Sequence, residues 1–315
     1  MKQPLVSILI PVYNAQETIN RCIDSCINQT YKIIEIIVCN DGSFDNTVQL
    51  LNQYNTQIKV LKNDMNSGIA FSRNKLLNEA KGEYIAWIDA DDWMVENRIE
   101  TQIEFMLQHP EIDICGSAIL ISNLKKVKYQ AQESNLIKEK LWFSNCLFQP
   151  SVMSKNFYKN EHIYYNSDFD YMEDYELWYR LKEVKKFYNL NKALTVYNMP
   201  NEDELRQKHK KYSFENKLDR LWKLKWEDTK ICSLNVQDKE LFKDFLRNNK
   251  IRTTEEIHSI INTLNVIKSK ENSLIIHYHV LRLWVKNCRV IQKLKFLKLI
   301  KSFFYFHQLK AKYLI

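Results

Sequence analysis

The stretch from Tyr84 to Trp93 constrains the fold of this 315-residue chain more than any other segment. It reads Tyr-Ile-Ala-Trp-Ile-Asp-Ala-Asp-Asp-Trp, an apolar, strand-like run that ends in three carboxylates within four positions. A continuous apolar run is typical of a buried parallel strand, and ligands of open α/β sheets bind beyond the carboxyl ends of such strands. We therefore expect an α/β sheet with a ligand site at Asp89, Asp91 and Asp92.

These three acids fit two interpretations. Carboxylate oxygens suit Mg²⁺ or Mn²⁺, which often bridge a carboxylate to a substrate phosphate. Alternatively, the acids cap a helix predicted over residues 95–108, because negative charge is favourable at a helix N-terminus. An EF-hand is excluded, since Trp93 and Met94 occupy loop positions that require a ligand and a glycine. Taken alone, the three acids fit a metal site and a helix cap equally well.

Strand-like and helical segments alternate through the first 90 residues. The strands are expected at residues 5–10, 33–39, 58–61 and 83–88, with amphipathic helices between them. Such alternation indicates a parallel, three-layer α/β sheet with polar loops at the carboxyl ends of its strands. Asn14, with Glu17 three positions on, predicts a capping box at the start of the first helix, and Asp45 predicts a cap for the second.

The composition and the absence of several known motifs exclude some classes of protein. The sequence contains no GxGxxG, GxxxxGK[ST] or GxSxG pattern, which excludes a dinucleotide fingerprint, a P-loop and a nucleophile elbow. No apolar run approaches the ~20 residues that span a bilayer, and the N-terminus lacks a signal-peptide apolar region. The seven cysteines form no CxxC pair, so a zinc site is not supported. We expect a globular protein located in the cytoplasm.

The net charge of +8 comes from the C-terminal tail. From residue 272 onward there are nine basic residues and no Asp or Glu. Residues 293–306 separate on a helical wheel into a broad apolar and aromatic face and a lysine face, a pattern that suits the surface of an anionic membrane. We expect the tail to attach peripherally to the inner face of the cell membrane; packing on the catalytic domain or on a second subunit is the alternative. No nucleic-acid-binding module is recognisable.

A further acidic pair, Glu173-Asp174, begins a segment with helical spacing. If this segment is a helix, Asp174 lies in its first turn on the same face as Leu177 and Trp178. A carboxylate at that position tends to stay ionised, which a general base requires. A capping acid beside a buried tryptophan is the other interpretation.

Together, the polar loops resemble those of glycosyltransferase family 2, the inverting nucleotide-sugar transferases with a Rossmann-like glycosyltransferase-A fold. The matching stretches are Pro11-Val12-Tyr13-Asn14, Asn40-Asp41-Gly42-Ser43 with Asp45 and Thr47, Asn66-Ser67-Gly68 running to Arg73-Asn74, Gly82, Asp89-Ala90-Asp91-Asp92 and Glu173-Asp174. They occur in the family's order over residues 4–200. The resemblance implies an α/β fold, a three-layer sheet of the glycosyltransferase-A type, with a C-terminal helical extension.

The resemblance also implies a division of the chain. A catalytic domain is expected over residues 1–200, with a nucleotide-binding half at 1–116 and an acceptor half at 117–200. The remainder, 201–315, is expected to be a helical region that ends in the basic amphipathic tail, 272–315. Because the sequence lacks a Gln-x-x-Arg-Trp pattern and a membrane span, the processive polymer synthases of the family are disfavoured.

The family pattern implies roles for individual residues. Asp41 would hydrogen-bond the imide of a uracil base, Tyr13 would pack near it, and Arg73 would lie near the diphosphate. Asp91 would ligate Mn²⁺ or Mg²⁺, with Asp89 toward the ribose or the metal, so that the metal neutralises the diphosphate leaving group. The other nucleotide-binding residues implied by the resemblance are Pro11, Asn14 and Asn66.

In the same pattern, Asp174 would remove the proton from an acceptor hydroxyl, which attacks the anomeric carbon opposite the departing nucleotide. The implied function is the inverting transfer of one sugar, from a UDP-sugar, to a saccharide or lipid-linked glycan acceptor in lipopolysaccharide, lipooligosaccharide or capsule synthesis. One departure is that Tyr197-Asn198 stands where relatives carry a Tyr-Arg pair and then a histidine. The nearest histidine, His209, lies in a charged run and is expected to be solvated.

Two other functions are considered. A non-catalytic scaffold could keep the same fold within a membrane glycan-assembly complex, but intact Asp89, Asp91 and Asp174 argue against it. A nucleotidyltransferase is disfavoured, because the sequence lacks a glycine- and arginine-rich phosphate loop near its N-terminus.

Overall fold

The structure is a computed structural model that describes part of the chain in detail. The described residues are 3–199, 219–222, 224–225, 235–248, 256, 259, 260 and 263. They belong to two compact units, Met1–Lys217 and Leu218–Ile315. His209 and the basic tail at 272–315 lie outside the described residues.

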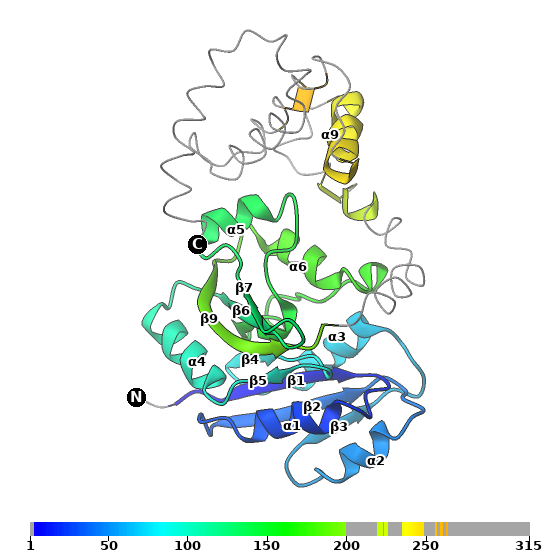
Figure 1. Cartoon of the computed structure of the whole chain (residues 1–315), viewed down its shortest axis with the longest axis vertical. Coiled ribbons are helices and arrows are strands. Elements are labelled where there is room, and N and C mark those ends of the chain that lie inside the picture. The colour runs from blue at the N-terminus through cyan, green and yellow to red at the C-terminus, as the bar shows by residue number, and fades with distance from the viewer. Residues whose placement is uncertain are drawn as a thin grey trace. The chain divides into compact units, whose positions relative to one another are not determined.

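In the described part of the first unit, nine strands form one sheet in the order β3-β2-β1-β4-β8-β6-β9-β5, with β7 paired to β6 (Figure 1). The strands are β1 (Val6–Val12), β2 (Ile34–Asn40), β3 (Lys59–Lys62), β4 (Tyr84–Trp87), β5 (Trp93–Met94), β6 (Ile114–Ile121), β7 (Lys126–Lys128), β8 (Met153–Lys155) and β9 (Phe187–Tyr197). Strands β1 to β4 are parallel. Strand β8 is antiparallel to β4 and β6, whereas β9 is parallel to β6.

Helices cover both faces of this sheet. They are α1 (Ile19–Ile27), α2 (Thr47–Asn52), α3 (Ile69–Glu79), α4 (Arg98–Gln108), α5 (Ser134–Lys140) and α6 (Glu173–Leu181), with 3₁₀ turns η1 (Gln149–Ser151) and η2 (Ser167–Phe169). Side chains of a strand alternate between faces. Ile8 and Ile10 of β1 therefore join the core formed with α1 and α4, while the buried Leu9 points to the other face, where α3 contacts β1 and β2. The expected three-layer α/β fold is confirmed.

The capping box expected at Asn14 does not form. Helix α1 begins at Ile19, after the N-cap Thr18. Asn14 has a left-handed backbone, with φ of 50°, and it binds the loop after β2 instead of its own helix. Its N–H donates to Oγ of Ser43 at 2.9 Å, and its side-chain oxygen accepts from the N–H of Phe44 at 3.0 Å.

Asp92 is not the helix cap that the sequence suggested. Helix α4 begins at Arg98 with Asn97 as its N-cap, because the preceding residues form the short strand β5. The buried carboxylate of Asp92 instead accepts a hydrogen bond from the N–H of Asn198 at 2.8 Å. It thereby ties the end of β9 to the loop after β4.

Two segments of the acceptor half also differ from expectation. Residues 122–135, expected to be a loop, contain β7 and the first two residues of α5. The strand expected over 148–153 divides into η1 and β8. Pro150 lies in η1 and has no N–H to give to a strand ladder, so strand pairing begins only at Met153.

The described pieces of the second unit include helix α9 (Val236–Asn248). Its Phe242 ring lies edge-on to Trp222 with centroids 6.2 Å apart, and Nζ of Lys243 lies 3.3 Å from the carboxylate of Asp219. Throughout the described residues, no helix combines the length and apolar character needed to cross a bilayer.

Candidate active site

One pocket of about 1060 Å³ gathers the polar loops that follow β1, β2 and β4. Because these strands are parallel, their carboxyl ends meet at the same edge of the sheet. The pocket brings together all nine residues that the sequence proposed for the site. These are Pro11, Tyr13, Asn14, Asp41, Asn66, Arg73, Asp89, Asp91 and Asp174.

Asp41 is held at the end of β2 by three hydrogen bonds. Its Oδ1 accepts from Nδ2 of Asn63 at 2.7 Å and from the N–H of Ser67 at 2.9 Å. Its Oδ2 accepts from the N–H of Gly68 at 3.0 Å, and Gly68 has φ of 95°, a conformation that favours glycine. Since a carboxylate oxygen can accept more than one hydrogen bond, Oδ2 retains capacity for a ligand N–H.

The loop that carries Tyr13 is fastened to the loop after β2. The N–H of Ala15 donates to Oγ1 of Thr47 at 2.9 Å. The N–H of Gln16 donates to Oδ2 of Asp45 at 3.2 Å. Asp45 and Thr47, recognised in the sequence as parts of a motif, therefore shape the wall of the pocket through backbone contacts. Asp45 also accepts from the N–H of Thr47 at 3.0 Å, but the N-cap of α2 is Asn46 and it makes no side-chain capping hydrogen bond, so Asp45 is not the cap that the sequence predicted.

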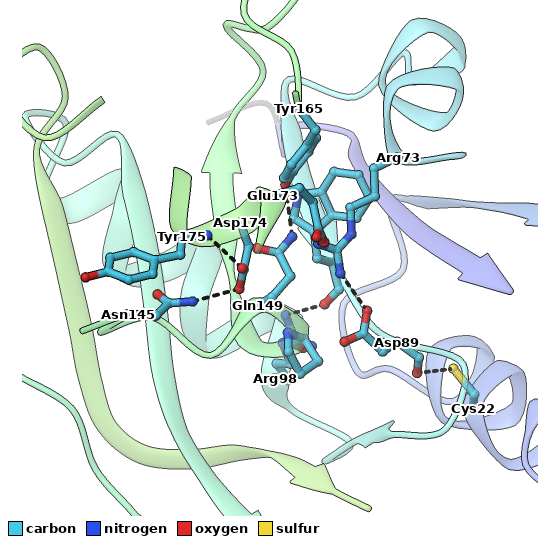
Figure 2. A network of polar contacts seen from close by, with 12 residues as sticks. Cys22, Arg73, Asp89, Arg98, Asn145, Gln149, Tyr165, Glu173, Asp174 and Tyr175 are labelled. Atoms are coloured by element: carbon cyan, nitrogen blue, oxygen red, sulfur yellow. Dashed lines mark hydrogen bonds and ion pairs between the residues drawn. The ribbon is translucent and has the colours of Figure 1, made fainter. Parts of the chain in front are cut away.

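Arg73 lies at the centre of the polar network (Figure 2). It is supplied by α3, is 2% exposed, and forms ion pairs with Glu173 and, at 3.1 Å, with Oδ1 of Asp89. The rings of Trp87 and Tyr165 lie 5.7 Å and 5.5 Å from its guanidinium carbon. Burial works against the charged form, but Glu173 and then Asp89 raise the pKa of Arg73 above its ordinary value. Arg73 lines the pocket, and its ion pairs go to the carboxylates of Glu173 and Asp89.

The three acids after β4, Asp89, Asp91 and Asp92, lie close enough together to influence one another's ionisation. Burial raises the pKa of Asp92 well above its ordinary value, and repulsion from Asp91 and Asp89 adds to the rise. Within the described residues, Oδ2 of Asp92 is buried without a hydrogen-bond partner. Such a set of carboxylates fits a divalent cation that is also bound by phosphate and water. No group of three or more His, Cys, Asp or Glu residues in the described part is arranged to hold a metal by itself.

Asp174 lies in the first turn of α6 with both carboxylate oxygens engaged (Figure 2). Oδ1 accepts from the N–H of Tyr175 at 2.6 Å, and Oδ2 accepts from Nδ2 of Asn145 at 2.8 Å. The amide of Asn145 is oriented by its other end, where Oδ1 accepts from the N–H of Leu147 at 3.2 Å. Burial raises the pKa of Asp174, while Arg73 and these two hydrogen bonds oppose the rise.

The neighbouring acid, Glu173, is fully enclosed. Burial raises its pKa to about 7, Arg73 opposes that rise, and Asp174 adds to it. Because Arg73 contacts both Glu173 and Asp89, a continuous chain of charges joins the start of α6 to the end of β4. The helix that carries Asp174 is thus positioned against the acidic cluster.

Sequence reasoning missed Asn145, which lines the pocket, and Phe44, which contacts the pocket residue Tyr13. Asn145 belongs to no recognisable motif. The one sequence feature that could have drawn attention to it is that it is the only amide side chain in the largely apolar segment Leu141–Phe148. Phe44 is 82% exposed and lies edge-on to Tyr13, with centroids 6.1 Å apart. An exposed aromatic residue inside a polar motif was the signal that could have identified it.

The family model described as Glycosyl transferase family 2 matches residues 7–245. The chain belongs to glycosyltransferase family 2. Its relatives include an uncharacterized glycosyltransferase of Haemophilus influenzae, 32% identical over 212 residues that cover 62% of this chain and 66% of the relative. WfgD of Escherichia coli, a UDP-Glc:alpha-D-GlcNAc-diphosphoundecaprenol beta-1,3-glucosyltransferase, is 35% identical over 180 residues that cover 56% of this chain and 70% of the relative. The chain matches 57% to 66% of the length of three glycosyltransferase relatives, two from Haemophilus influenzae and one from Rickettsia typhi.

Solved structures of glycosyltransferases share the fold of this family member. S. aureus TarS 1-349 in complex with UDP aligns with a TM-score of 0.58 at 19% identity, covering 88% of this chain and 87% of that chain. The mannosyltransferase PcManGT from Pyrobaculum calidifontis, in complex with GDP-Man and Mn²⁺, aligns with a TM-score of 0.53 at 12% identity, covering 98% and 81%. The expected glycosyltransferase-A type of fold is confirmed.

Proposed function

We propose that this family 2 chain is an inverting glycosyltransferase that moves one sugar from a UDP-sugar to a saccharide acceptor in bacterial surface-glycan synthesis. The observation that carries the proposal is the single pocket that contains Asp41, the acidic cluster at Asp89 and Asp91, and Asp174. The names of the relatives WfaP and WfgD support a UDP-sugar donor and a lipid-linked acceptor, since both are UDP-Glc:alpha-D-GlcNAc-diphosphoundecaprenol glucosyltransferases.

In this proposal the donor's uracil binds at the ends of β1 and β2. The imide N–H donates to Oδ2 of Asp41, which accepts one other hydrogen bond. Tyr13, 41% exposed, and Phe44 supply aromatic surface near the base. Asn14 and Asn66 complete the wall, and the hydrogen bonds of Asn14 hold that wall in place before the nucleotide arrives.

The diphosphate then lies beside the acids after β4. A divalent cation, Mn²⁺ or Mg²⁺, held by Asp91 with Asp89 would neutralise the charge that develops on the departing diphosphate. Arg73 keeps one oxygen of Asp89 fixed through its 3.1 Å ion pair. That contact leaves the rest of the Asp89 carboxylate to the ribose or the metal.

Asp174 acts as the general base. It takes the proton of the acceptor hydroxyl while that oxygen bonds to the anomeric carbon and the bond from this carbon to the diphosphate breaks, releasing UDP. Asn145 and the N–H of Tyr175 hold the two oxygens of Asp174 in fixed positions during the transfer. Because attack is opposite the leaving group, the configuration inverts. The raised pKa of Asp174 strengthens it as a proton acceptor.

A panel of nucleotide sugars tests the proposal. Purified protein with Mn²⁺ or Mg²⁺ should hydrolyse or transfer sugar from a UDP-sugar, and Asp91→Ala should weaken metal-dependent UDP binding. Absence of turnover with every UDP-sugar, together with unchanged UDP binding in Asp91→Ala, would refute it. Calorimetric titration with UDP and Mn²⁺ separates this enzyme from the non-catalytic scaffold, because a scaffold that has lost the site binds neither.

Attachment of the basic tail to an anionic membrane is a separate part of the proposal. It rests on the sequence of residues 272–315, which holds nine basic and no acidic residues. Flotation with vesicles that contain anionic lipid should recover the full chain and lose a variant truncated after residue 271. Equal recovery of both proteins would exclude this role of the tail.

A further inference from the structure

Alternating side chains of β7 build a basic wall on the acceptor side of the pocket. Strand β7 pairs antiparallel with β6, so that Lys128 lies opposite Ile119 and Lys126 lies opposite Ile121. Residues directly opposite each other share one face of a sheet. Ile119, Ile121 and Lys128 all line the pocket, and so does Gln130, two positions beyond Lys128. Lys126 therefore projects from the same face, toward the rim.

A third lysine reaches this wall from α5. Nζ of Lys140 donates to Oε1 of Gln130 at 2.5 Å, and Nζ of Lys128 lies 5.5 Å from the ring centroid of Phe148. Burial lowers the pKa of Lys140, the Cys146 thiol opposes this change, and the charge of Lys128 adds to the lowering. In the described part of the chain, neither these two lysines nor Lys126 forms an ion pair with a carboxylate.

Solvation of an edge strand does not explain the whole cluster. Lysines on an edge strand discourage pairing with the strand of another molecule, and this explains why a lysine stands at position 126. Lys140 comes from a helix and is half-buried, and Lys128 and Gln130 line the pocket itself. Other lysines of the same half do have acidic partners. Examples are the pairs Lys138–Glu183, Lys155–Asp113 and Lys185–Glu161.

The pocket thus has charges of opposite sign on its two sides. Asp89 and Asp91 lie at the end of β4, Asp174 begins α6, and the lysines of β7 and α5 lie on the acceptor side. Ammonium groups close to each other without acidic partners are stabilised by an anion, and phosphate is an anion that lysine binds as a point charge. An acceptor whose hydroxyl faces Asp174 extends along this wall.

We propose that Lys128 and Lys140, with Lys126 at the rim, form a subsite for a phosphate group that the acceptor carries. This assignment rests on the proposed function for the identity of the pocket as a donor and acceptor site. The acceptor is then a sugar phosphate or a sugar diphosphate, and its charge places its hydroxyl at Asp174. Gln130 fixes the ammonium group of Lys140 within the subsite.

Binding of two matched probes tests the subsite. The full chain is saturated with UDP and Mg²⁺ and titrated by calorimetry with N-acetylglucosamine 1-phosphate and with the methyl glycoside of the same sugar. The wild type should bind the phosphorylated probe about 10-fold more tightly at low ionic strength, as a charge-assisted contact predicts. The double variant Lys128→Gln/Lys140→Gln should bind both probes equally, and salt should reduce the preference of the wild type.

Lys81→Gln is the matched control, because Lys81 is exposed and precedes β4, outside the pocket lining. It should keep the wild-type preference. Equal affinity of the wild type for both probes, binding of neither, or a preference that survives in the double variant would overturn the subsite.

UDP affinity is measured in every variant. If the double variant lost UDP affinity as strongly as probe affinity, the lysines would serve the donor diphosphate and the proposal would be wrong. Thermal melting of each variant verifies that it is folded. Since binding is the readout, failure of sugar transfer in the nucleotide-sugar panel would count against the proposed function alone and leave this result interpretable.

Discussion

The donor half and the acceptor half of the first unit hold their functional side chains in different ways. In the predicted donor half, Asp41 directly follows β2, Asp89 lies two positions after β4, and backbone N–H groups of Ser67 and Gly68 hold Asp41. In the predicted acceptor half, the proposed base Asp174 is held by a side chain from a distant loop, and the basic wall comes from a three-residue strand and a short helix. The proposed donor-binding residues therefore lie at strand ends, and the proposed acceptor-side residues lie in the connections between elements.

Replacing the proposed base should separate the two halves most sharply. Asp174→Asn removes the proton acceptor, so we expect the turnover rate kcat for transfer to fall about 10²- to 10⁴-fold. The donor half is untouched, so the affinity for UDP measured by calorimetry should stay the same. Asp168→Asn, an exposed acid of the same half, should transfer sugar at the wild-type rate. Loss of UDP binding in Asp174→Asn would show that the two halves are not independent.

Removing Arg73 should break the link between the halves. Arg73→Met leaves Glu173 and Asp89 without their shared cation, and an uncompensated buried charge costs about 3–5 kcal/mol of unfolding free energy. Denaturant unfolding should show this loss, and adding Glu173→Gln should recover part of it. A single variant as stable as the wild type would mean that the buried ion pairs contribute no net stability.

Substituting Asn145 should affect the acceptor half alone. Asn145→Leu removes a hydrogen bond to the charged form of Asp174, and such bonds contribute about 1.5–3 kcal/mol. We expect kcat to fall about 10-fold or more, and the acidic limb of the pH–rate profile to move to higher pH, because the pKa of Asp174 rises. An unchanged pH profile with a reduced rate would indicate a merely structural role for Asn145.

The pH dependence of wild-type activity should show the smallest of these effects, and it tests the proposed role of Asp174 as a base. A base works only when ionised, so activity should fall as the pH drops through the pKa of Asp174. Burial raises this pKa, and the acidic limb should therefore lie above the ordinary aspartate value of about 3.9. Glu173, with a pKa raised to about 7, titrates together with Asp174, so the limb reports the pair. An acidic limb with an apparent pKa at or below that of an ordinary aspartate would contradict a raised pKa for Asp174.

The strand ends of the predicted donor half could be located from the sequence, because each one is marked by a pattern of neighbouring residues. An apolar run followed by polar residues locates a strand end, and parallel strands bring those ends together. This rule points to Asp89 and Asp91, the family resemblance adds Asp41, and all three line one pocket. Asp174 was placed in the first turn of a helix by spacing alone, and the structure has it there.

What the sequence did not reveal depends on partners far along the chain. The backbone of Asn14 is fixed by contacts with the loop after β2, about 30 residues away, so its local resemblance to a helix cap was misleading. The partner of Asp92 is Asn198, which is 106 positions distant. Asn145 and Lys128 gain their roles only when β6, β7 and α6 meet around the pocket, and no local pattern encodes that meeting.

The position of β8 has a mechanical consequence. This strand, which lies in the predicted acceptor half, is hydrogen-bonded to β4 on one side and to Ile114 and Cys115 of β6 on the other, and both partners lie within residues 1–116. The buried guanidinium of Arg98 adds donated bonds to carbonyl oxygens of Trp87, Pro150 and Val152 across the same seam. A hinge movement between β8 and the strands on either side of it would break this ladder. A chimaera that exchanges acceptor halves between relatives must keep the register of β8.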